Sequence, residues 1–168
     1  MPNFEEIEKL PFDAKRLFFD LKRMGSDEIA KAHSKNPECP DSYWYFLQKF
    51  GYGQIRNPNE PINYPAHFEI SKNLVSASAD YYKDELIFDN GAMGDVLFFG
   101  FESTGIGYGF DTGDGYGLVC VDNYRIVTAL NLSFERFMVG MLVCYPDIPF
   151  DYDSGKWVIE TGESYSIL

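Results

Sequence analysis

Short apolar runs separated by turn residues fill the middle of the chain and predict a β-sheet. The runs are rich in aromatic and β-branched side chains, which favour strands. They span residues 86–89, 96–101, 108–111, 116–121 and 124–130. Glycine, asparagine and aspartate stand between them and tolerate the backbone conformations of tight turns, and Asn90-Gly91 is a hairpin signal. The intervals are too short for crossover helices, so we expect neighbouring strands to pair antiparallel.

Apolar side chains recur at helical spacing on both sides of this region. Residues 43–50 carry one apolar stripe, and residues 133–142 carry a second one after a capping residue, Asn131 or Ser133. Both helices should pack on the sheet. The core residues that we expect from these patterns are Phe46, Leu47, Phe110, Leu118, Phe134 and Phe137.

The remaining segments are predicted more coarsely. The N-terminal third favours short helices over residues 4–10, 13–24 and 26–33. Residues 67–82 admit either a helix capped by Ser71 or irregular structure. The tail admits a strand at residues 156–160 or a loose extension.

Together these segments predict an α+β fold, in which helices flank a largely antiparallel sheet of about five or six strands. We expect a single domain over residues 1–168, with residues 147–168 as a C-terminal extension. A content of 45% hydrophobic and 17% aromatic residues is typical of a packed globule.

The net charge of −12 narrows the classes of partner. Binding to phosphate backbones needs Lys and Arg to displace counterions, and anionic membrane surfaces also favour basic proteins. We therefore expect neither a nucleic-acid partner nor a membrane partner. The acidity serves either solubility alone or attraction to a basic protein.

The cysteines and the N-terminus favour a cytoplasmic location. Cys120 and Cys144 lie in apolar segments and are expected to be buried, reduced thiols, and Cys39 beside two prolines looks structural. The first twelve residues are acidic and lack the basic and apolar regions of a signal peptide. No apolar run approaches the roughly 20 residues that span a bilayer.

Candidate chemistry is sparse. The glycines of residues 105–110 lead into a strand, whereas a nucleotide loop opens a helix. The segments 111–115 and 151–155 combine Asp with Gly, but neither continues as a calcium loop, and turn chemistry explains both. Two histidines, His33 and His67, cannot form a multi-histidine metal site. A carboxylate pair such as Glu102 with Asp111 arises by chance among 26 acidic residues. We expect no catalytic residue, no cofactor and no metal.

Several short motifs follow one another in the order of a known superfamily. They lie within residues 39–138 and are Pro40-Asp-Ser-Tyr43, Phe46-Leu47, Phe50-Gly51-Tyr-Gly53, Gly94-Asp95, Gly109-Phe110-Asp111-Thr112 and Leu132-Ser-Phe-Glu-Arg-Phe137. In these motifs the chain resembles the SUKH superfamily, which includes Smi/Knr-type regulators and many bacterial immunity proteins. The segment 102–107 resembles an insertion, and the tail after Pro146 carries no motif of the family.

The resemblance implies a largely antiparallel sheet flanked by helices and a function in protein binding. Many members of the superfamily neutralise a cognate toxin, often a nuclease, and eukaryotic relatives regulate cell-wall synthesis. We therefore predict a non-enzymatic, cytoplasmic immunity protein that masks the active surface of a basic toxin domain. The alternative is a Smi/Knr-like regulatory scaffold that binds an endogenous partner.

Loop acids are the predicted partner face, since loops carry function more often than their scaffold does. The predicted acids are Glu102, Asp111, Asp114 and Asp122, with Tyr116 as an anchor. Trp44 is the starting point for contacts on the helical side. Asp111 and Asp114 have a competing role in turns, so Glu102 and Asp122 should be the cleaner tests.

Overall fold

The protein is described from a computed structural model. The structure describes residues 1–9, 21–55, 68–78, 85–88 and 94–141, together with three short strands beyond residue 149. Among the described residues, no helix is long and apolar enough to cross a membrane.

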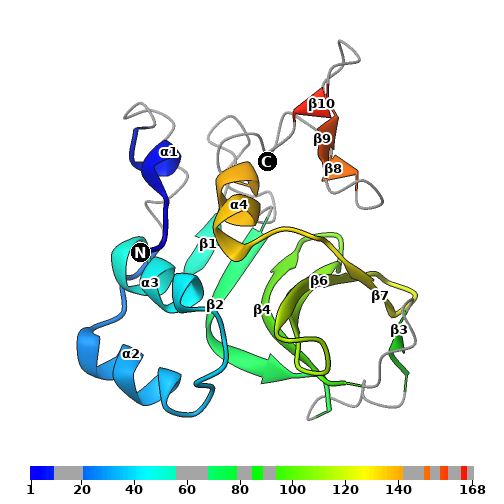
Figure 1. Cartoon of the computed structure of the whole chain (residues 1–168), viewed down its shortest axis with the longest axis horizontal. Helices are drawn as coiled ribbons and strands as arrows, with labels where there is room; N and C mark the ends of the chain where they lie inside the picture. Colours follow the sequence, from blue (N-terminus) through cyan, green and yellow to red (C-terminus); the bar gives the residue numbers. More distant parts are fainter. Residues whose placement is uncertain are drawn as a thin grey trace.

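Seven strands form the main sheet, in the order β1-β2-β4-β5-β6-β7-β3 (Figure 1). The strands are β1 (Gly53–Ile55), β2 (Phe68–Ser76), β3 (Ile87–Phe88), β4 (Val96–Glu102), β5 (Gly107–Asp111), β6 (Gly117–Val121) and β7 (Ile126–Ala129). The α+β class is confirmed, and the predicted strands from residue 86 to 130 match to within two residues at each end. The sheet has more strands than the five or six expected.

One pairing differs from the expected antiparallel arrangement. Strand β3 pairs parallel with β7, with Ile87 opposite Ile126, while all other neighbours in this sheet are antiparallel. Strands β4, β5 and β6 come between β3 and β7 in the sequence, so no short turn forces these two strands to be antiparallel. The predicted hairpin at Asn90-Gly91 lies outside the described residues.

The segment that admitted a helix at Ser71 is strand β2, so the helical interpretation is wrong. Phe68 and Ile70 are buried and Glu69 is exposed between them, as the period of a strand requires. The register with β4 shifts between Ile70 and Val75, and this irregularity obscures the alternation in the sequence.

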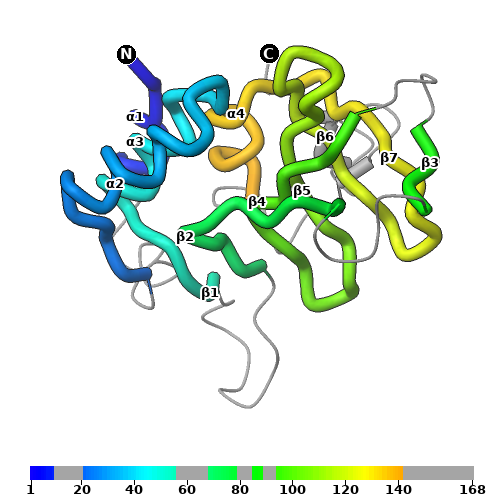
Figure 2. Tube along the Cα trace, turned by 90° about the horizontal axis from the view of Figure 1, so that it is seen from below, coloured from blue at the N-terminus to red at the C-terminus, as the bar shows by residue number. Residues whose placement is uncertain are grey.

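In the described ranges four helices lie beside the sheet: α1 (Glu5–Glu8), α2 (Ser26–His33), α3 (Asp41–Lys49) and α4 (Phe134–Val139). The Ser133 hydroxyl caps α4 by accepting a hydrogen bond from the Arg136 N–H at 3.2 Å. Figure 2 shows α1, α2 and α3 together at one side of the molecule, with β7 and β3 at the opposite side.

The predicted helix over residues 13–24 is wrong at its C-terminal end, and residues 13–20 lie outside the described part. Lys22 forms an isolated antiparallel bridge with Tyr52 through two backbone hydrogen bonds of 2.8 and 3.0 Å. This bridge holds the backbone extended next to Gly51, whose φ is +118°. A Cβ at Gly51 would meet the Lys22 carbonyl carbon at 2.7 Å, so the motif glycine permits this contact.

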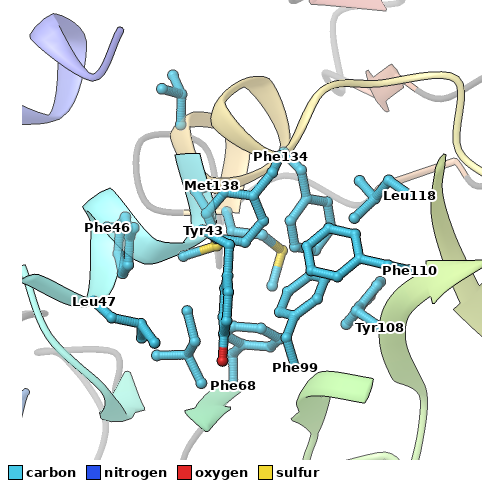
Figure 3. Packing of buried hydrophobic residues seen from close by; sticks show 14 of the residues in the cluster. Tyr43, Phe46, Leu47, Phe68, Phe99, Tyr108, Phe110, Leu118, Phe134 and Met138 are labelled. Carbon is cyan, nitrogen blue, oxygen red and sulfur yellow. The ribbon is translucent and has the colours of Figure 1, made fainter. Parts of the chain in front are cut away.

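Both faces of the central strands are buried. The larger core lies between the sheet and the helices, where Tyr43, Phe99, Phe110 and Phe134 pack at ring distances of 5.0–6.0 Å (Figure 3). All six predicted core residues are buried. A smaller core covers the other face and contains Ala77, Val96, Phe98, Val119, Val121 and Val127.

The tail forms a separate small sheet. Strands β8 (Phe150–Asp151), β9 (Lys156–Val158) and β10 (Ser164–Tyr165) pair antiparallel in the order β10-β9-β8. The alternative of a strand near residues 156–160 is therefore the correct one.

Candidate functional site

The predicted partner residues lie at opposite ends of the sheet. Successive strands from β4 to β7 alternate in direction, so the turns after β4 and β6 share one end and the turn after β5 lies at the other. We call the first the Phe101 end, which comprises residues 101–107 and 121–126 with residues 85–87. The second, the Asp111 end, comprises residues 94–95 and 111–117. Glu102 and Asp122 lie at the Phe101 end, away from Asp111, Asp114 and Tyr116, so the predicted acids do not form one face.

At the Phe101 end both acids are engaged in hydrogen bonds. Glu102 accepts from the Tyr108 hydroxyl and, at 3.0 Å, from the Thr104 hydroxyl. The Asp122 Oδ1 accepts from the backbone N–H groups of Tyr124 at 2.8 Å and Ile126 at 2.9 Å. Asp122 therefore shapes the turn after β6, and its substitution by lysine would disturb the turn as well as the charge.

At the Asp111 end the exposure expected for Asp111 is wrong, whereas its competing role in a turn is confirmed. Its side chain is 2% exposed, and its Oδ1 accepts a hydrogen bond from the Gly113 N–H at 2.9 Å. Asp114 is exposed and, within the described part of the chain, its carboxylate makes no hydrogen bond. Asp111 and Asp122 therefore stabilise turns through hydrogen bonds to backbone amides, whereas the Asp114 carboxylate does not.

Tyr116 and Trp44 are less accessible than a partner anchor requires. Tyr116 is half-buried against the larger core, and burial followed by the nearby Glu38 raises the pKa of its hydroxyl. Trp44 is 4% exposed and stacks edge-on with Tyr43 at 4.7 Å. Its burial contradicts the prediction of a surface anchor, because Trp44 packs on Tyr43 and also on His33 of α2, whose ring is 5.6 Å away.

An apolar patch at the Phe101 end was not predicted. It is the apolar wall of a cavity of about 180 Å³ and consists of Leu86, Phe98, Phe101 and Val121, of which Phe101 is 40% exposed. Tyr124 in the turn at the same end is 82% exposed. Ile87 is 58% exposed but lies between Leu86 and Phe88, which both pack on the smaller core, so its side chain points away from this patch. The signal in the sequence is the unbroken apolar run Val96-Leu-Phe-Phe, followed after Gly100 by Phe101, because a strand apolar at every position presents such residues to both faces.

Charged and polar groups line the rest of this cavity. Arg125 lines the cavity and forms an ion pair with Glu85, and Asp122 and Asn123 complete its polar rim. An apolar centre inside a polar rim is the usual anatomy of a protein interface.

A second and larger cavity lies between α2 and β2. Its volume is about 460 Å³, and three lysines, Lys31, Lys35 and Lys72, line it together with Trp44. A cluster of three lysines is unusual in this protein, because the whole chain holds 14 basic and 26 acidic residues.

Neither a metal site nor a similar protein points to a function for these surfaces. Within the described ranges, no three His, Cys, Asp or Glu side chains lie close enough together to hold a metal ion. Comparison of the chain with protein-family models, with curated proteins and with solved structures finds no match. The apolar patch and the two cavities are therefore the features of the described residues that bear on function.

Proposed function

We propose that this protein is a non-enzymatic immunity protein, which binds a basic toxin domain and masks its active surface. The observation that carries the proposal is the apolar patch of Leu86, Phe98, Phe101 and Val121 at the Phe101 end, set inside a polar rim on a chain of net charge −12. Exposed aromatic clusters with polar rims mark binding sites in soluble proteins. The SUKH resemblance supplies the class of partner.

Charge and apolar contacts serve different steps of binding. The overall negative charge attracts a basic partner and raises the association rate to roughly 10⁸ M⁻¹s⁻¹ or more at low salt. Phe101 and Tyr124 then lose their solvent-exposed surface in the complex, which slows dissociation. A nuclease toxin fits this scheme, since its active surface is basic in order to bind nucleic acid.

A cytoplasmic location follows from the same proposal. Toxins that cleave nucleic acids act inside the cell, so the inhibitor has to be present there. The buried thiols of Cys39 and Cys120 form no disulfide with each other, which suits a reducing compartment.

Coexpression tests the proposal. We expect a toxin domain to be encoded next to the gene for this chain, and we expect this chain to restore growth when both are expressed in one cell. Growth arrest that persists despite folded, expressed chain would overturn the immunity function. Binding of an endogenous enzyme without protection would instead favour the regulatory scaffold.

Variants of the patch test the surface. Phe101→Ala and Tyr124→Ala should each weaken binding by about 2 kcal/mol, roughly 30-fold, mainly through faster dissociation. Asp114→Ala is the matched control, since it removes an exposed side chain at the opposite end of the strands. Unchanged dissociation of both aromatic variants would place the interface elsewhere on the molecule.

A further inference from the structure

The cavity between α2 and β2 has an unusual charge for this protein. Lys31 and Lys35 come from the end of α2 and the turn after it, and Lys72 comes from β2. None of these lysines is paired with a carboxylate among the described residues. All three lysines are exposed, and the Lys72 ammonium lies 5.5 Å from the centre of the Tyr52 ring. Like charges this close together repel each other, so the cluster favours a negatively charged ligand.

The one acid in the cavity wall does not neutralise the lysines. The Glu28 carboxylate accepts a hydrogen bond from the Gly25 N–H at 3.1 Å and thereby caps α2. Three positive charges and one negative charge leave a net charge of +2. Asn36 and Asn73 add amide donors to the same wall.

The floor of the cavity is apolar. Trp44 lies there with Met24 and Leu74, and it is 4% exposed. The volume of about 460 Å³ falls in the range of small-molecule sites, roughly 300–1,000 Å³.

We propose that this cavity binds a small molecule that carries a phosphate monoester. A phosphate dianion balances the net charge of +2, and lysine is a common phosphate ligand because its ammonium acts as a point charge. The apolar floor would contact the organic part of the ligand. Binding here is independent of the partner patch at the Phe101 end, which involves other strands.

Titration with adenosine 5′-monophosphate, inorganic phosphate and adenosine tests the site. The chain has two tryptophans, so in the full chain carrying Trp157→Phe the fluorescence reports on Trp44 alone, and calorimetry gives the affinity independently. We expect the monophosphate to bind with a Kd below about 1 mM, to bind more weakly at high salt, and to bind at least tenfold more tightly than adenosine.

Lysine variants connect the binding to the cavity. Lys31→Gln and Lys72→Gln should each weaken monophosphate binding about tenfold or more, the loss typical of a charge-assisted hydrogen bond. Lys22→Gln is the matched control, because Lys22 is an exposed lysine outside the cavity wall. Binding of inorganic phosphate with the same lysine dependence would also support the site.

Three results would overturn the proposal. The first is that neither adenosine 5′-monophosphate nor inorganic phosphate binds at about 10 mM, a concentration that detects millimolar affinity. The second is that adenosine binds as tightly as the monophosphate. The third is that Lys22→Gln weakens monophosphate binding as much as the cavity variants do. None of these outcomes bears on the patch at the Phe101 end, which the coexpression experiment tests separately.

Discussion

Phe134 lies where three parts of the larger core meet. Its ring is 5.6 Å from Tyr43 of α3 and 5.2 Å from Phe99 of β4 (Figure 3). It is also 6.5 Å from the ring of Phe4. We expect Phe134→Ala to lower the free energy of unfolding by about 3–5 kcal/mol, because the cavity left behind cannot collapse on several elements at once. Urea denaturation followed by circular dichroism measures the change.

Tyr124→Ala is the control for this substitution. Tyr124 is 82% exposed, so its removal should change the free energy of unfolding by no more than about 0.5 kcal/mol. A loss below about 1 kcal/mol for Phe134→Ala would contradict the tight packing described above.

The buried thiols give the protein a defined response to alkaline pH. Burial raises the pKa of Cys39 and of Cys120 to about 12, with smaller effects from Glu38 and Asp122. An unfolded cysteine loses its proton near about pH 8.5, so the folded state holds more protons between these values. The free energy of unfolding should therefore fall as pH rises from about 8.5 toward 12, by up to about 1.4 kcal/mol per pH unit for each thiol.

Denaturation under reducing conditions at several alkaline pH values checks this slope. Cys120→Ala should flatten it, whatever the variant's stability at neutral pH, and the exposed Lys22→Gln should not. An identical slope in wild type and Cys120→Ala would show that the thiol ionises freely in the folded protein.

The sequence predicted burial better than it predicted surface roles. Phe46, Phe110 and Phe134 were expected in the core because apolar periodicity reports directly on burial. Whether Asp111, Asp122 and Trp44 are exposed depends on which backbone amides or helices lie near them. The spacing of residues along the chain does not contain that information. Turn chemistry was predicted for Asp111 and Asp114; it is confirmed for Asp111, but the second turn aspartate is Asp122 and not Asp114.

At the level of elements, close contact between β4 and β5 depends on glycine. A Cβ at Gly109 would meet the Leu97 carbonyl oxygen at 2.6 Å and a Val96 methyl at the same distance. Gly109→Ala should therefore cost about 1–3 kcal/mol, because the strands would have to move apart.

Gly117→Ala is the matched control for Gly109→Ala. Its Cβ would approach the Asp114 carbonyl oxygen only to 3.3 Å, so its cost should be smaller. Thermal unfolding of both variants gives the comparison. Equal shifts in Tm would mean that β4 and β5 are not held as closely as the structure indicates.

The strands from β4 to β7 were predictable, whereas β2 and the position of β3 were not. Hairpin neighbours follow from short turns, which leave only one pairing available. The pairings of β2 with β4 and of β3 with β7 join segments far apart along the chain. In β2 the register shift also removes the alternation of buried and exposed residues on which strand prediction relies.

For the whole molecule, the predicted consequence of the acidity is rapid, salt-dependent association with the partner. Glu102→Gln and Asp122→Asn remove a charge from the Phe101 end while keeping a side-chain oxygen that can accept the same hydrogen bonds. Both variants should associate more slowly than wild type at low ionic strength, and the differences should shrink as salt is added.

Stopped-flow association with the captured toxin domain, over a range of ionic strengths, measures this effect. Asp114→Asn removes the same charge at the opposite end of the sheet and should have the smaller effect. A larger effect of Asp114→Asn would move the partner face to the Asp111 end.

The contact of α1 with α4 has a consequence for the newly made chain. Phe4 is 1% exposed and packs on Phe134, and Glu6 pairs with Arg136 across a separation of 130 residues. A ribosome that adds about 5–20 residues per second needs roughly 6.5 to 26 s to cover this interval. Phe4 also packs on Phe46 of α3 and on Phe50 at ring distances of 5.6 Å, so part of its ring can be buried long before α4 is made. The Phe134 contact and the Glu6–Arg136 ion pair form only after α4 has been synthesised, so a chain whose synthesis stalls before α4 lacks these two contacts at its N-terminus.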